Sequence, residues 1–242
     1  MIVAVVVVLA LLVGLLVVSR LGQSDDGGRE AGVTGSGLPV LFADGFGDEG
    51  SGWESRSVGG VTQGYVDGAY EVRFEPPAPP GAFALATEGG TSVDARDVRV
   101  TVRATVLGQG GGVRDGAGVS CRVSDRGAYY FIVSSGGGWS IQKLREGRVN
   151  AVALAVSDPD VPDPAIAQGL ATNTIRADCS GARGEPAVLA LTVNGETVAS
   201  TEDPDPLPAG GVGLAAAGPT DADPAGYAVS FDELLVEDLA DA

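Results

Sequence analysis

The chain has 242 residues, with 38 glycines, 14 prolines, no histidine and a formal net charge of −17. The absence of histidine excludes Ser-His-Asp and Cys-His nucleophile pairs and every His-ligated metal site, and the acidic surface repels phosphate backbones, so nucleic acid is not expected as a partner. The glycines and prolines recur between short apolar runs, which predicts an all-β chain, and the length suits one large domain of this class.

The chain begins with an uncharged apolar run over residues 2–18. Its length lies at the short end of what spans a bilayer and exceeds most signal-peptide cores, so we predict a transmembrane anchor over residues 1–19. A cleaved signal peptide is the alternative, although the residues at the end of the run are a poor cleavage boundary. Arg20 follows the run and by the positive-inside rule weakly favours a cytoplasmic C-terminal part. The two cysteines favour the opposite orientation, and we therefore expect a single-pass protein of the cell membrane whose β domain lies outside the cytoplasm.

Residues 20–38 are polar, rich in glycine and without periodicity, and we predict a flexible linker there. The β domain is expected over residues 39–242. Alternation and turn signals predict a succession of short strands, with Asn194-Gly195 as a strong two-residue hairpin turn. In chain order, the expected strands cover residues 39–46, 64–66, 69–74, 82–87, 97–107, 117–124, 128–134, 139–145, 150–156, 173–179, 187–193, 196–201, 211–217 and 227–237.

Cys121 and Cys179 are the only cysteines, and each lies on the apolar face of an alternating run. Two cysteines without histidine cannot form a zinc site. An inward-facing pair in an exported β domain predicts a disulfide between adjacent strands or facing sheets. The alternative is two separate buried thiols.

The stretch from residue 118 to residue 144 suggests a binding surface on a sheet. If Cys121 lies opposite Phe131 and Tyr130 lies opposite Gln142, then Arg122, Tyr130 and Gln142 form one row across three strands on the outward face. A guanidinium, a phenol ring and an amide are the groups with which proteins stack on sugar rings and bind adjacent hydroxyls. The alternative is a solvated face on which the arginine lies over the tyrosine.

Trp53 adds one further aromatic candidate, in a loop after the first expected strand. Its indole ring could stack on a ligand. The alternative is that the ring packs over an edge of the sandwich.

Four segments in a fixed order carry a resemblance to a known superfamily: "LFADGFGDEGSGW", "VSCRVSDRGAYYFIVSSGGGWSIQKLREG", "NTIRADCSG" with "LALTVNGETVAST", and "GGVGLAAAG" to "VSFDELLVED". Over residues 39–238 the chain resembles the concanavalin A-like lectin/glucanase superfamily, in particular the laminin G-like and 3-keto-disaccharide hydrolase-like domains found behind a membrane anchor in actinobacteria. The resemblance implies a jelly-roll β-sandwich of two antiparallel sheets. The Glu-x-Asp-x-x-Glu pattern of the glucanases is absent from this sequence.

Some members of this superfamily bind calcium, which is the one cofactor that the resemblance offers. The resemblance places Asp44 in the first strand and Asp232 in the last, where they would be neighbouring calcium ligands. Asp48 or Glu49 could add further oxygen ligands. The alternative is that these carboxylates are solvated groups of an acidic surface.

Taken together, the sequence predicts an extracytoplasmic, membrane-anchored and non-catalytic module that binds a glycan of the cell envelope or the environment. A protein-interaction or structural module of the envelope is the alternative, with an envelope protein as partner. A glycoside hydrolase-like enzyme is a third class, which the missing glucanase pattern disfavours.

Overall fold

The computed structural model describes residues 35–75, 78, 83–87, 95–108, 115–146, 151–219 and 226–240. The predicted anchor at residues 1–19 and the linker up to residue 34 lie outside the described residues. Within the described ranges, no helix is long and apolar enough to cross a membrane. Residues 33–242 form one compact unit.

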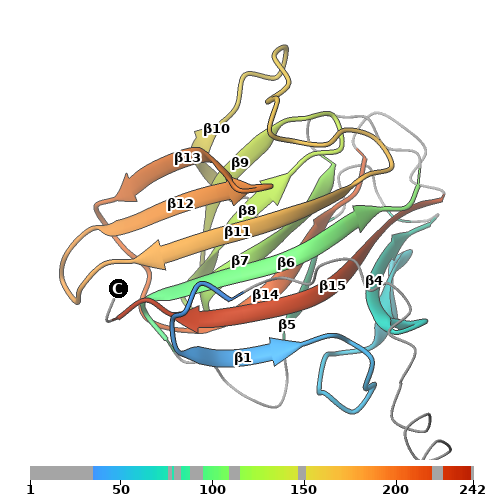
Figure 1. Cartoon of the computed structure of the whole chain (residues 1–242), viewed down its shortest axis with the longest axis horizontal. Helices are drawn as coiled ribbons and strands as arrows, with labels where there is room; N and C mark the ends of the chain where they lie inside the picture. The colour runs from blue at the N-terminus through green and yellow to red at the C-terminus, as the bar shows by residue number, and fades with distance from the viewer. Residues whose placement is uncertain are drawn as a thin grey trace, which may run out of the picture. The chain divides into compact units, whose positions relative to one another are not determined.

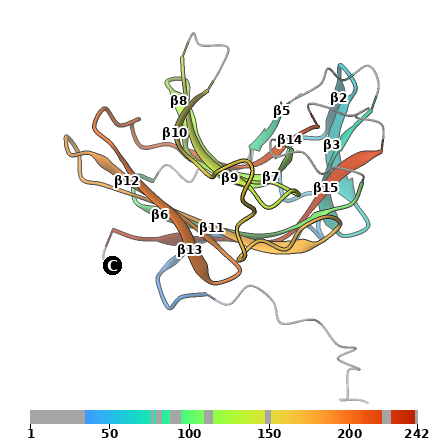
Figure 2. The ribbon, with the colours of Figure 1, turned by 90° about the horizontal axis from the view of Figure 1, so that it is seen from above.

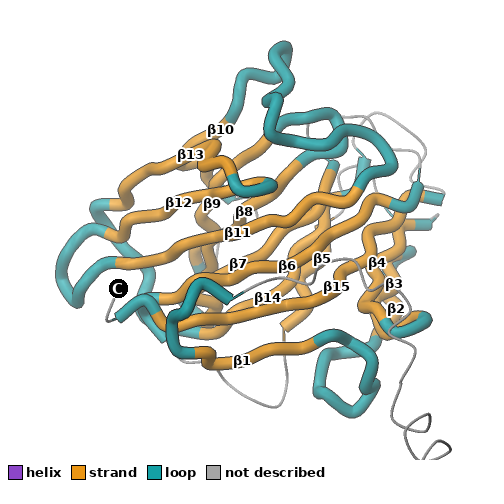
Figure 3. The backbone as a smooth tube through the Cα atoms, viewed as in Figure 1, coloured by secondary structure: helices purple, strands orange, loops and turns teal. Residues whose placement is uncertain are grey.

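The described residues form two antiparallel sheets (Figures 1 and 3). The larger sheet has the order β13-β12-β11-β6-β15-β4-β3-β2, and β1 pairs with the second half of β15. Its strands are β1 (Val40–Asp44), β2 (Arg56–Val58), β3 (Val61–Val66), β4 (Ala69–Phe74), β6 (Val98–Val106), β11 (Thr172–Ser180), β12 (Ala187–Val193), β13 (Glu196–Asp203) and β15 (Tyr227–Asp238). The smaller sheet has the order β10-β9-β8-β7-β14-β5. Its strands are β5 (Phe83–Thr87), β7 (Gly116–Ser124), β8 (Gly127–Val133), β9 (Trp139–Arg145), β10 (Val152–Val156) and β14 (Gly211–Ala217).

The prediction of an all-β sandwich with two antiparallel sheets is confirmed, and each expected strand overlaps an observed one. Two differences lie in the N-terminal part. β3 begins at Val61, earlier than expected, and the short strand β2 was not predicted. All three residues of β2 are exposed, so no apolar alternation marks it in the sequence.

The core lies between the two sheets, which are stacked in the view from above (Figure 2). Every second side chain of the central strands points inward, as the pleat of a β-strand requires. The predicted disulfide between Cys121 and Cys179 is present and joins β7 of the smaller sheet to β11 of the larger one. The same core contains the buried side chains of Val98, Val100, Val119, Tyr129, Phe131, Ile141, Ile175, Leu189 and Leu191.

A β-bulge in β7 changes the predicted outward face. Cys121 pairs with Tyr129, whereas Ser124 pairs with Gly127, so β7 carries one extra residue between these pairs. Arg122 lies in the bulge with a φ of 51°. Because a bulge places two residues opposite one, the side chains beyond it change face. The expected pairing of Cys121 with Phe131 is also wrong, because Cys121 pairs with Tyr129, two residues away.

Candidate functional site

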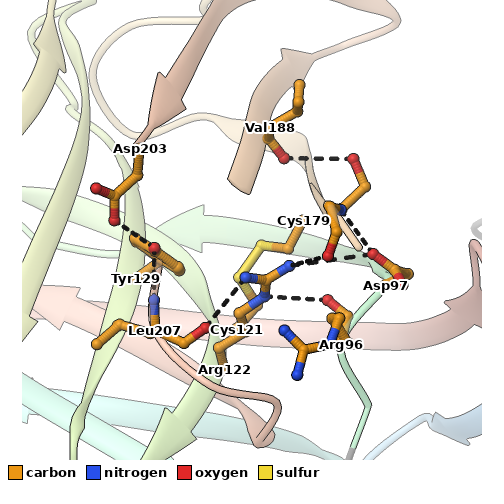
Figure 4. The surroundings of a disulfide bond; sticks show 11 residues. Arg96, Asp97, Cys121, Arg122, Tyr129, Cys179, Val188, Asp203 and Leu207 are labelled. Carbon is orange, nitrogen blue, oxygen red and sulfur yellow. Dashed lines mark hydrogen bonds and ion pairs between the residues drawn. A yellow bond between two sulfur atoms is a disulfide. The ribbon is translucent and has the colours of Figure 1, made fainter. Parts of the chain in front are cut away.

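Arg122 lies inside the protein, and its predicted place on the outward face is wrong. Its side chain has no exposed surface. Nε donates to the carbonyl of Arg96 at 3.1 Å, Nη1 to that of Leu207 at 3.1 Å and Nη2 to that of Gly181 at 3.4 Å (Figure 4). Burial lowers the pKa of this guanidinium. Arg122 therefore holds three chain segments together beside the disulfide and is not available to a surface ligand.

Ser120 takes the place on the outward face that was predicted for Arg122. It pairs with Tyr130, and Tyr130 pairs with Gln142 as expected, so the row across β7, β8 and β9 is Ser120, Tyr130 and Gln142. Only 5% of Tyr130 is exposed, which leaves little of its ring for a sugar to stack on, and this burial raises its pKa. Nε2 of Gln142 donates to Ser140 Oγ at 2.8 Å.

A hollow of about 260 Å³ lies at one end of this outward face. Its floor is apolar. Because of the bulge, the side chain of Val123 packs on this face, and that of Arg122 does not. Gly127 allows the turn between β7 and β8 to approach β9, since a Cβ at this position would lie 1.9 Å from the carbonyl oxygen of Leu144. The floor consists of Leu85, Val123, Ala128, Tyr130 and Leu144, and the charged residues on the lining are Asp125, Arg145 and Glu146.

A second and larger hollow, of about 880 Å³, adjoins the first and shares its three charged residues. The chain segments that line it are Arg96, two residues before β6, the turn between β7 and β8, the end of β9, Gly184 and the connection from β13 to β14. Its charged lining residues are Arg96, Asp125, Arg126, Arg145, Glu146 and Asp205. Sequence reasoning missed this hollow, because these segments are far apart in the chain. The one local signal was the charged Asp125-Arg126 turn facing the Arg145-Glu146 strand end across a hairpin.

Buried polar contacts hold the wall of the second hollow that consists of residues 205–208. Lys143 forms an ion pair with Asp203 and donates to the carbonyl of Asp205. The hydroxyl of Tyr129 donates to Asp203 and accepts from the backbone N–H of Leu207 at 3.0 Å. Burial alone would raise the pKa of the Asp203 carboxyl, but the hydrogen bonds from Lys143 and Tyr129 outweigh it and hold this pKa below its usual value. Burial raises the pKa of Tyr129.

Trp53 packs on the sandwich and does not present its ring to solvent. It is 4% exposed, and its ring centroid lies 5.6 Å from that of Phe46 and 5.8 Å from that of Tyr70. Nε1 donates to Asp44 Oδ2 at 2.9 Å, while Asp44 Oδ1 accepts from the N–H of Phe46 at 2.7 Å. Both carboxylate oxygens of Asp44 thus hold the loop that carries Trp53. This is the packing arrangement that was the alternative for Trp53.

The predicted calcium ligands lie on neighbouring strands, because β1 pairs with β15 as expected. Asp44 pairs with Leu234, and Asp232 pairs with Arg103 of β6 across the other edge of β15. In the part of the chain that the structure describes, no group of three acidic or cysteine residues is placed to hold a metal ion. Calcium binding by Asp44 and Asp232 stays a prediction.

No protein-family model matches the sequence, and the search of curated proteins finds no match. Solved structures with the same fold include the carbohydrate-binding module CBM66 from Bacillus subtilis, with 15% identity, a TM-score of 0.53, and coverage of 77% of this chain and 96% of that chain. A Bacillus subtilis protein of unknown function with a galectin-like fold has 10% identity, a TM-score of 0.56 and coverages of 83% and 96%. A prokaryotic β-1,3-1,4-glucanase (lichenase) from a mouse hindgut metagenome has 13% identity, a TM-score of 0.54 and coverages of 82% and 99%. The chain therefore shares its fold with carbohydrate-binding and glycan-cleaving proteins.

Proposed function

We propose that the protein is a membrane-anchored, extracytoplasmic module that binds a glycan of the cell envelope or the environment without cleaving it. The observation that carries this proposal is the first hollow on the outward face of the smaller sheet. An apolar floor suits the C–H face of a sugar ring, and guanidinium and carboxylate groups beside it suit the hydroxyls. The fold shared with CBM66 and the glucanase supports the same ligand class.

The sugar contacts of this site differ from the predicted row. Gln142 lies on the outward face but outside the lining of the hollow, Arg122 is buried, and Tyr130 contributes to the floor. Arg145 replaces the missing guanidinium, and Leu144 and Val123 supply apolar surface. The site is therefore shifted along the sheet, from the middle of the row toward the turn between β7 and β8.

A protein-interaction module is the second candidate, and one observation favours it. β10 is one of the two edge strands of the smaller sheet as described, and its Val152 and Val156 are each 65% exposed. An exposed edge strand with apolar side chains can pair with an extended segment of another protein. Such a partner would bind away from the hollow, so that variants of the hollow would not affect it.

The test is binding of the full-length chain, in mild detergent under oxidising conditions, to a panel of glycans and isolated cell-wall fractions. Tyr130→Ala is a poor variant here, because truncating a buried aromatic residue costs about 3–5 kcal/mol of stability. Leu144→Ser removes apolar surface from the half-buried floor. Glu196→Ala is the matched control, since this exposed residue begins β13 and lies roughly 23 Å from Asp203 at about 3.3 Å per residue.

We expect saturable binding that Leu144→Ser weakens at least tenfold and Glu196→Ala leaves unchanged, with equal thermal unfolding of all three proteins. Absence of saturable binding to any glycan or fraction would overturn the proposal. Release of shorter saccharides from a bound glycan would overturn its non-catalytic part. Binding that survives Leu144→Ser would move the site away from the first hollow.

A further inference from the structure

Four charged side chains on the lining of the second hollow have no hydrogen-bond or ion-pair partner among the residues that the structure describes. Arg96 and Arg126 provide guanidinium donors, and Asp125 and Glu146 provide carboxylate acceptors. Other charged groups nearby are paired: Arg145 with Asp205, Lys143 with Asp203, and Arg122 with Asp97 at 4.0 Å.

The lining of the second hollow carries as many guanidinium groups as carboxylates, which selects against a charged ligand. An anion near Arg96 and Arg126 would also meet Asp125 and Glu146, and a cation would meet the two guanidinium groups. A hydroxyl group both donates and accepts, so an uncharged polyol can satisfy both kinds of group at once. We infer that the second hollow is a subsite for an uncharged sugar that continues the first hollow, so that the protein binds a neutral oligosaccharide in preference to a single sugar.

The two hollows adjoin each other, because Asp125, Arg145 and Glu146 line both. Their volumes are unequal, with about 260 Å³ in the first and about 880 Å³ in the second. Ligand pockets commonly measure about 300–1,000 Å³, so the first hollow suits a single ring and the second has room for more than one. A linear saccharide that starts on the apolar floor would thus extend past the turn between β7 and β8.

The wall of the second hollow is fixed before a ligand arrives. Arg122 bonds to the carbonyls of Arg96 and Leu207, which both line the hollow. Lys143 and Tyr129 hold the opposite ends of the segment from Asp205 to Leu207. Because these groups are already ordered, binding loses little conformational entropy in the wall, which favours affinity.

The inference rests on the proposed function, and the experiment separates the two. Three ladders of one to six sugar units serve as probes for the full-length chain: neutral β-1,3-1,4-glucan oligosaccharides, anionic oligogalacturonides and cationic chitosan oligosaccharides. Affinities are measured by calorimetry, with saturation-transfer NMR for the single sugars. Arg126→Gln is the test variant, because Arg126 is exposed and lines only the second hollow, and Glu196→Ala is again the control.

We expect affinity for the neutral ladder to rise at least tenfold from one to three units. Arg126→Gln should reduce this increase in affinity at least fivefold and leave the affinity for the single sugar unchanged. No binding of any ladder would overturn the proposed function together with the inference. Binding that does not depend on length, a gain that Arg126→Gln leaves intact, or tighter binding of a charged ladder would overturn the inference alone.

Discussion

Replacing Lys143 by methionine should destabilise the fold strongly, because it leaves a buried carboxylate without its cation. The side chains of Lys143 and Asp203 are 7% and 5% exposed, and Lys143 is the only lysine of the chain. Breaking one partner of a buried ion pair costs about 3–5 kcal/mol, whereas replacing both partners by apolar residues is often neutral. We therefore expect Lys143→Met to cost about 3–5 kcal/mol and the double variant Lys143→Met/Asp203→Leu to recover most of this loss.

The assay is urea unfolding followed by the fluorescence of the two tryptophans, Trp53 and Trp139, which both lie in the β domain. The matched control is Arg56→Gln. Arg56 and Glu54 form an exposed pair at 3.9 Å, and such pairs contribute less than about 1 kcal/mol.

The pH dependence gives an independent check. The pKa of Asp203 is lowered in the folded protein, so the wild type keeps this stabilisation above the unfolded value of about 3.9 and loses it as the pH falls through the folded pKa. In Lys143→Met, burial raises the pKa of Asp203 without the opposing ammonium group, and protonation removes the uncompensated charge. The difference from the wild type should therefore shrink as the pH falls toward about 4 and below. A cost under about 1 kcal/mol at pH 7, or a double variant as unstable as the single one, would refute the reasoning.

Two further predictions concern the same domain. Replacing Cys121 and Cys179 by alanine should lower the free energy of unfolding by about 4 kcal/mol, because the disulfide closes a loop of 58 residues in the unfolded chain; an unchanged urea midpoint would contradict this. The free energy of unfolding should also fall as the pH rises above about 10. Burial raises the pKa of most of the tyrosines in the folded protein, so these tyrosines ionise at lower pH in the unfolded chain. Tyrosinate absorbance should then appear together with loss of the near-ultraviolet circular dichroism, and a gradual titration of an intact fold would argue against it. The tyrosines concerned are Tyr70, Tyr129, Tyr130 and Tyr227.

Much of the strand pattern was predictable, because a strand with one buried face alternates apolar and polar residues. Val119 and Cys121 in β7, and Ile175 and Cys179 in β11, are buried as that alternation predicts, and the disulfide follows from it. The hairpin from β8 to β9 was also predictable, since a period of two fixes the face of every side chain once one pair is known. The candidate site was only partly predictable, because Gln142 lies on the expected face while Arg122 does not.

The sequence by itself determined the class of the fold, the positions of most strands and the disulfide, because these depend on local alternation and on two cysteines with no other chemistry. The tertiary structure alone decided the position of Arg122, because one added residue in β7 turns its side chain inward to carbonyls of three distant segments. It alone also brought Arg96, Arg126 and Glu146 to one hollow. Bulges and hollows depend on which strands become neighbours, and that is set by long-range packing that no short stretch of sequence encodes.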